Sequence, residues 1–183
     1  MNSNELILKH TKNWITSFVL QLNLCPFAQR EMDRKTVRFQ VSSAKNIRQA
    51  LADAVQEMKL LDSKREIETT LLIFPSLFKN FQGYLDFIAL LESVLLENNY
   101  EGIYQMATFH PEYCFTNEEP EDVSNYTNRS PYPMIHFLRE KSIEEALKYH
   151  NAEKVPETNI RLLRTLGLEE VKKRLAACLN NQG

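Results

Sequence analysis

Glycine is scarce in this 183-residue chain, and its glycines never cluster. They stand alone at Gly83, Gly102, Gly167 and Gly183, so the chain has no glycine-rich loop of the kind that cradles phosphate groups. The G-x-S-x-G turn of the usual serine hydrolases is also missing. These absences exclude the common nucleotide-dependent enzymes and the usual serine hydrolases.

Cysteine is scarce too, and the charge is nearly balanced. Three cysteines, far apart and odd in number, do not suggest a disulfide framework, which favours a reducing, cytoplasmic setting. Lys and Arg number 22 against 24 Asp and Glu, for a net charge of −2, and no basic stripe points to nucleic acid. The N-terminus lacks the basic start and apolar core of a signal peptide.

Long apolar runs are absent as well. None approaches the roughly 18 residues of a membrane helix. We therefore predict a cytoplasmic protein with no membrane or nucleic-acid partner. The sequence indicates neither a cofactor nor an oligomeric state.

What the chain does have is a regular succession of helix and strand patterns. Its length suits one domain over residues 1–183. Apolar residues at helical spacing predict helices over 3–22, 43–61 and 79–98, with shorter ones over 142–150, 156–166 and 168–179. Ser3 and Ser43 are expected to cap the first two, and His10 is expected to be exposed. Strand patterns cover 36–42, 69–74, 103–109 and 134–139.

The first three predicted strands alternate with helices, which favours crossover connections and parallel pairing. The direction of the fourth strand is not readable. We predict the α/β class, as one domain with a mixed, partly parallel sheet of about four strands flanked by helices.

A proline-rich loop between residues 109 and 140 stands out. From Pro111 to Pro133 it has no helix or strand period, and irregular connections longer than about 12–15 residues are commonly functional or disordered. Aromatic anchors favour an ordered loop. The loop leaves the third strand at His110, where sheets of this kind usually form sites. The anchors are Tyr113, Phe115, Tyr126 and Tyr132.

Three side chains are candidate catalytic groups: Cys25, His110 and His136. Pro26 disfavours a helical conformation at Cys25, which would let the thiol point into a cleft. Alternatively, Cys25 is a small buried core residue. Either histidine could act as acid or base near neutral pH, and one close to Cys25 would make the thiol a nucleophile.

Arg129 is the candidate anion-binding group. It stands beside two prolines that stiffen the segment, and its planar fork suits a carboxylate or phosphate. An equally good alternative is a structural arginine that bonds loop carbonyls. The other candidate binding residues are Asn128, Tyr113, Tyr126, Ser130 and Arg139.

Strand alternation puts Arg139 and His136 on opposite faces, which counts against both entering one pocket. We expect a pocket for a small anionic molecule, in which Cys25, His110 and His136 would supply any catalysis.

Two other functions fit the same residues. His110 and Cys114, four apart, suit zinc, with Cys25, His136 or Asp122 as a third ligand. However, a proline directly after His110 disfavours a helical ligand pair, and CxxC and HExxH are absent. Tyrosines and prolines on a rigid loop also describe the interface of a non-catalytic scaffold.

Two sequence motifs resemble those of a known family. Residues 24–28 read Leu-Cys-Pro-Phe-Ala, residues 109–111 read Phe-His-Pro, and residues 128–133 read Asn-Arg-Ser-Pro-Tyr-Pro, followed by His136. Together they resemble domain-of-unknown-function family 1415, a bacterial family of about this length. The resemblance implies a single cytoplasmic domain and supplies no reaction.

Overall fold

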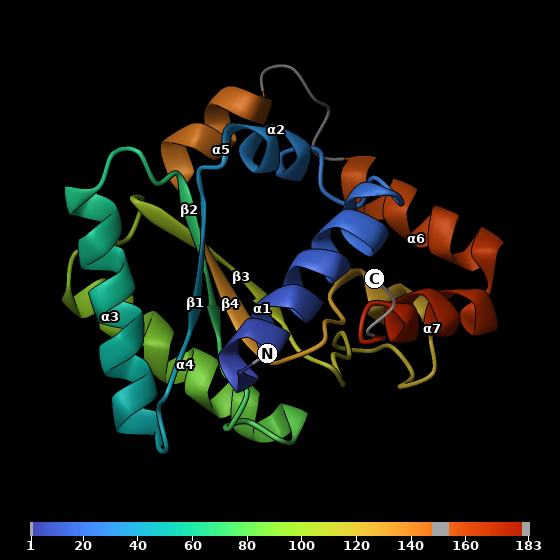
Figure 1. The fold of residues 1–183 in the computed structure, drawn as a ribbon, viewed down its shortest axis with the longest axis horizontal. Coiled ribbons are helices and arrows are strands. Elements are labelled where there is room, and N and C mark those ends of the chain that lie inside the picture. Colours follow the sequence, from blue (N-terminus) through green and yellow to red (C-terminus); the bar gives the residue numbers. More distant parts are fainter. Residues whose placement is uncertain (1, 148–153, 181–183) are drawn as a thin grey trace.

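The computed structural model describes residues 2–147 and 154–180, and within them a four-stranded sheet has helices on both faces (Figure 1). The strands are β1 (Val37–Val41), β2 (Thr69–Ile73), β3 (Tyr104–Phe109) and β4 (Met134–Arg139), in the order β1-β2-β4-β3. β1 and β2 are parallel, whereas β4 is antiparallel to both β2 and β3. The predicted α/β class with a mixed sheet is confirmed.

The place of β4 explains why the sheet is mixed. β1, β2 and β3 run the same way, and β4 enters between β2 and β3 from the edge where those strands end: Met134 pairs with both Ile73 and Phe109. The segment joining β3 to β4 contains only a short 3₁₀ turn. Parallel strands are usually joined by a crossover that contains an α-helix, and this connection, which contains none, joins antiparallel strands.

Helices precede and follow the strands of the described chain. Side chains of Asn2, Asn46 and Asn80 cap the helices that follow them, each accepting a bond from a backbone N–H three residues on. The predictions that Ser3 and Ser43 cap the first two of these helices were therefore wrong. No helix in the described ranges is long and apolar enough to cross a membrane. The helical elements are α1 (Ser3–Trp14), the π-helical turn η1 (Ile15–Leu20), α2 (Ala28–Arg34), α3 (Ile47–Ser63), α4 (Phe81–Glu97), the 3₁₀ turn η2 (Val123–Thr127), α5 (Glu140–Leu147), α6 (Val155–Leu166) and α7 (Leu168–Ala177).

Some local predictions were wrong. The first predicted helix changes to π-helical geometry at Ile15, and α2 was missed because its seven residues are too few to show an apolar period. The helix predicted over 142–150 begins earlier, at Glu140, and residues 148–150 lie outside the described ranges. His10 is buried rather than exposed, and its Nδ1 lies 2.7 Å from the Tyr132 hydroxyl.

The two faces of the sheet pack into two cores. Alternate strand residues such as Ile135 and Phe137 pack against α3 and α4. Leu71, Ile73 and Met134 face the other way, towards α1, η1, α6 and α7. Figure 1 shows α3 and α4 on one side of the sheet and α1, α6 and α7 on the other.

Candidate functional site

A cavity of about 490 Å³ lies over the second face of the sheet, beneath η1, α2 and α6. This volume is within the usual range for small-molecule sites. Its floor includes one row of paired residues across three strands, Leu71, His136 and Ala107. Most of the lining is apolar, including Trp14, Val19, Leu24, Phe27 and Phe109.

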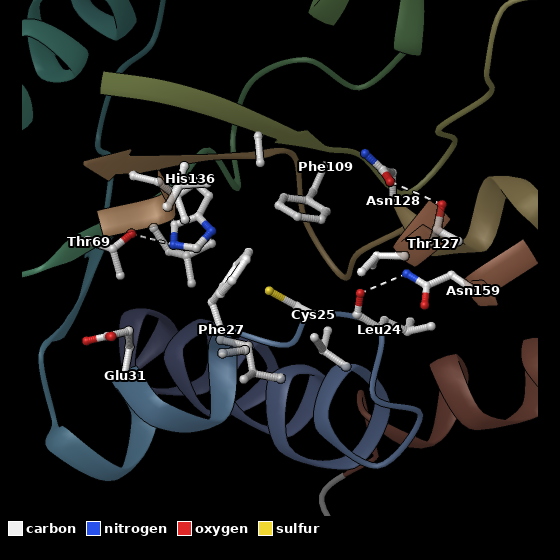
Figure 2. Close-up of a pocket in the computed structure, with 18 of the residues that line it drawn as sticks. Leu24, Cys25, Phe27, Glu31, Thr69, Phe109, Thr127, Asn128, His136 and Asn159 are labelled. Atoms are coloured by element: carbon white, nitrogen blue, oxygen red, sulfur yellow. Dashed lines mark hydrogen bonds between the residues drawn. The ribbon is translucent and has the colours of Figure 1, made fainter. Parts of the chain in front are cut away.

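His136 is the central polar group of this floor (Figure 2). Its Nε2 lies 2.5 Å from the Thr69 hydroxyl, which donates its only proton to the Phe137 carbonyl oxygen at 2.6 Å. Nε2 must therefore carry a hydrogen, which assigns Nδ1 as an acceptor. Nδ1 has no hydrogen bond to the described part of the chain. Burial lowers the pKa of His136 to about 4, so the ring is neutral at pH 7.

Cys25 lies on the opposite wall, in the turn between η1 and α2. The Asn159 side chain of α6 donates a 2.8 Å bond to the Leu24 carbonyl oxygen and so holds this turn. Figure 2 shows the Cys25 sulfur directed into the space between the Phe27 and Phe109 rings. Burial raises the pKa of the Cys25 thiol, although bonds from the backbone N–H groups of Phe27 and Ala28 oppose the rise. The resting group is a thiol.

The cations that border the cavity are already paired. Arg30 donates to the Glu31 carboxylate at 2.6 Å. Arg139 donates to the carbonyl oxygens of Leu61 at 2.6 Å and Ile67 at 3.0 Å. Neither guanidinium is therefore held ready for a ligand.

Two buried donors that line the cavity are unpaired. Within the described residues, the Trp14 indole nitrogen and the Ser124 hydroxyl have no hydrogen-bond partner. Buried polar atoms are nearly always bonded, so unpaired ones call for an explanation such as a missing ligand or water.

His110 lies away from the cavity, beneath the rings of Phe81 and Tyr84. Its Nε2 donates to the Phe78 carbonyl oxygen at 2.8 Å, and its Nδ1 accepts the Glu112 backbone N–H at 3.0 Å. Burial lowers the pKa of His110. Both ring nitrogens are used, so His110 fastens the start of the loop.

Arg129 also lies away from the cavity. It donates to the carbonyl oxygens of Tyr113 at 3.2 Å and Pro120 at 2.7 Å. Its guanidinium carbon lies 4.4 Å from the centre of the Tyr126 ring. These contacts are those of the structural arginine that the sequence left open as an alternative.

The structure thus brings together four of the nine predicted site residues. Asn128 and Arg139 join Cys25 and His136 around the cavity. The side-chain amide nitrogen of Asn128 donates a hydrogen bond to the Thr108 carbonyl oxygen at 3.0 Å. The residues that do not line the cavity are His110, Arg129, Tyr113, Tyr126 and Ser130.

The zinc hypothesis gains no support. In residues 2–147 and 154–180, no three His, Cys, Asp or Glu side chains lie close enough together to hold a metal ion.

Sequence reasoning missed several residues that form the site. Thr69 is 67 positions from His136, and Asn159 is 135 positions from Leu24. No local pattern could link such pairs. Phe27 was the exception, because it belongs to the Leu-Cys-Pro-Phe-Ala motif and could have been named with Cys25.

Comparison with known proteins found one family. The family described as proteins of unknown function, DUF1415, matches residues 6–173. No curated protein and no solved structure matched. Because the match covers most of the chain, this protein belongs to the DUF1415 family.

Proposed function

We propose that this protein binds a small, largely apolar and uncharged molecule in the cavity between the sheet and the η1, α2 and α6 layer. One observation carries the proposal: an apolar cavity of about 490 Å³ contains a neutral imidazole whose Nδ1 has no hydrogen bond to any residue that the structure describes. Small-molecule sites commonly combine an apolar lining with a few placed polar groups. A ligand hydroxyl or N–H would donate to Nδ1 of His136.

An uncharged ligand fits better than the anion expected from the sequence. Burying an unpaired charge costs far more than burying a hydrogen-bonded neutral group. An anion here would need a free cation, yet Arg30 is paired with Glu31 and Arg139 with backbone carbonyls. Arg129, on which the anionic prediction rested, is bound to loop carbonyls.

A fluorescence titration with N-phenyl-1-naphthylamine, an uncharged aromatic amine, tests the proposal. We expect one saturable site, and we expect the Ala107→Phe substitution, which fills the floor beside His136, to weaken binding at least about tenfold. Gln105→Phe is the matched control, because Gln105 is exposed on the same strand and does not line the cavity.

Equal binding by the two phenylalanine variants would place the probe elsewhere and reject the cavity as the site. Tight binding of inorganic phosphate that Arg129→Ala abolishes would instead favour an anion site at the loop.

A further inference from the structure

We propose that Cys25 accepts an acyl group from an uncharged ester or thioester held in this cavity. The inference rests on the proposed function, because the substrate must first bind between the sheet and the helices. It adds a reaction, a nucleophile and a substrate class.

The first support is the placement of the sulfur. Cys25 and His136 line the cavity from opposite walls, one from the turn before α2 and one from β4 (Figure 2). The backbone amides of Phe27 and Ala28 act to lower the pKa of the thiol, against the larger rise that burial causes. In covalent catalysis a base takes the proton of the nucleophile, and here the cavity between the two walls holds both a thiol and a base.

The second support is the orientation of the imidazole. The Thr69 hydroxyl accepts from Nε2 of His136 and donates to the Phe137 carbonyl oxygen. This pair of bonds leaves Nδ1 as the only ring atom able to take a proton. Thr69 is therefore a positioning residue, the third member that orients the base.

The third support concerns the ligand. Trp14 Nε1 and Ser124 Oγ are buried donors with no hydrogen-bond partner in the described part of the chain, and both residues line the cavity. A buried donor without a partner is destabilising, so a ligand oxygen that accepts from it gains affinity. Ester and thioester carbonyls supply such oxygens without bringing a charge.

The reaction balances without any oxidant or metal. The Cys25 sulfur attacks the carbonyl carbon, an S–C bond forms, and the bond from that carbon to the alcohol oxygen or thiol sulfur breaks. The thiol proton passes to Nδ1 of His136 and then to the leaving group. The products are an S-acyl cysteine and a free alcohol or thiol.

Reactivity would come from proximity rather than from an ionised thiol. Burial raises the pKa of Cys25 and lowers the pKa of His136, so both groups are neutral at rest. Thiols in apolar surroundings react slowly with reagents in solution. A bound ester held beside the sulfur gains a large effective concentration, which compensates for the weak nucleophile.

The experiment uses p-nitrophenyl hexanoate, an uncharged apolar ester, with the full-length protein. We expect release of one equivalent of p-nitrophenolate and a mass increase of one hexanoyl group, located on Cys25 by peptide mapping. Cys25→Ala should lose this label, and His136→Phe should slow its formation about 100-fold, the usual size of a lost proton-transfer group. Cys114→Ala is the matched control and should label like the unmodified protein.

Two outcomes would overturn the proposal. One is acylation of Cys114, Cys178 or surface lysines in place of Cys25. The other is absence of any label in protein that binds N-phenyl-1-naphthylamine in the cavity, in which case the binding function stands and the acyl transfer fails. Loss of both binding and labelling in folded protein would reject the proposed function as well.

Discussion

His110 and His136 differ in how their ring nitrogens are used. His110 bonds through both nitrogens, to Phe78 and Glu112. His136 bonds through one, to Thr69, and leaves the other open. The sequence treated these two histidines alike, because residue type alone carries no information about hydrogen-bond partners.

The lowered pKa values of His110 and His136 predict that the folded state is less stable in acid. Burial lowers the folded-state pKa of His110 and that of His136, the latter to about 4, below the ordinary value of 6.5. The unfolded chain therefore binds more protons, so the free energy of unfolding rises with pH in this range. We expect stability to be constant above about pH 7 and to fall from pH 6.5 towards pH 4.

Urea titrations at half-unit pH steps measure this dependence. His136→Phe and His110→Phe should each flatten the curve between pH 6.5 and 5, above the range where most carboxylates titrate. A wild-type midpoint that does not change over that interval would contradict the assignment of both rings as neutral.

Arg129 gives a second prediction for a single residue. Arg129→Ala removes two bonds to loop carbonyls and the contact with Tyr126, so we expect a loss of about 1–3 kcal/mol in the free energy of unfolding. Affinity for the uncharged probe should be unchanged, because Arg129 does not line the cavity. Unchanged stability with lost ligand affinity would restore Arg129 as a binding residue.

Tyr84 connects elements across the sheet. Its hydroxyl donates to the Met134 carbonyl oxygen at 2.8 Å and accepts the Phe109 backbone N–H at 3.2 Å, so α4 is tied to both β3 and β4. Tyr84→Phe leaves two backbone groups unpaired, and we expect it to cost about 1–3 kcal/mol in chemical denaturation. Tyr113→Phe is the control, since its hydroxyl has no bond within the described chain, and an equal cost would contradict the role given to Tyr84.

The Asn159 side chain joins α6 to the Cys25 turn by a hydrogen bond. Asn159→Ala removes the bond to the Leu24 carbonyl oxygen, so the turn should open more often. We expect faster alkylation of Cys25 by iodoacetamide, measured by peptide mass spectrometry. The exposed neighbour Thr158→Ala should leave the rate unchanged, whereas equal rates in all three proteins would show that Asn159 does not restrain the turn.

Helices and strands differ in how accurately the sequence predicts their positions. The strands at 69–74 and 134–139 were located to within a residue, because apolar strand residues mark burial directly. Boundaries of helices were missed where a side-chain cap decides them, as at Asn46. α2 was not predicted, because seven residues are too few to show a helical period of apolar residues.

The cavity belongs to the whole molecule, since its walls come from β2, β3, β4, η1, α2 and α6. A ligand that binds only the folded state stabilises it by mass action, about 2.7 kcal/mol at a free concentration of 100 times Kd. We expect N-phenyl-1-naphthylamine to raise the thermal unfolding midpoint of the wild type and of Gln105→Phe. No rise is expected for Ala107→Phe, and an equal rise in all three would contradict binding in the cavity.

By itself the sequence determined the α/β class, the approximate course of the strands and the candidates Cys25, His110, His136 and Arg129. These predictions rest on local periodicity and on the short-range spacing of residues, which can be read from the sequence without knowledge of the fold. Only the tertiary structure decided which polar groups share a cavity. Cys25 and His136 line one cavity from opposite walls, while His110 and Arg129 bond elsewhere. Packing decides which groups that are far apart in the sequence come close together.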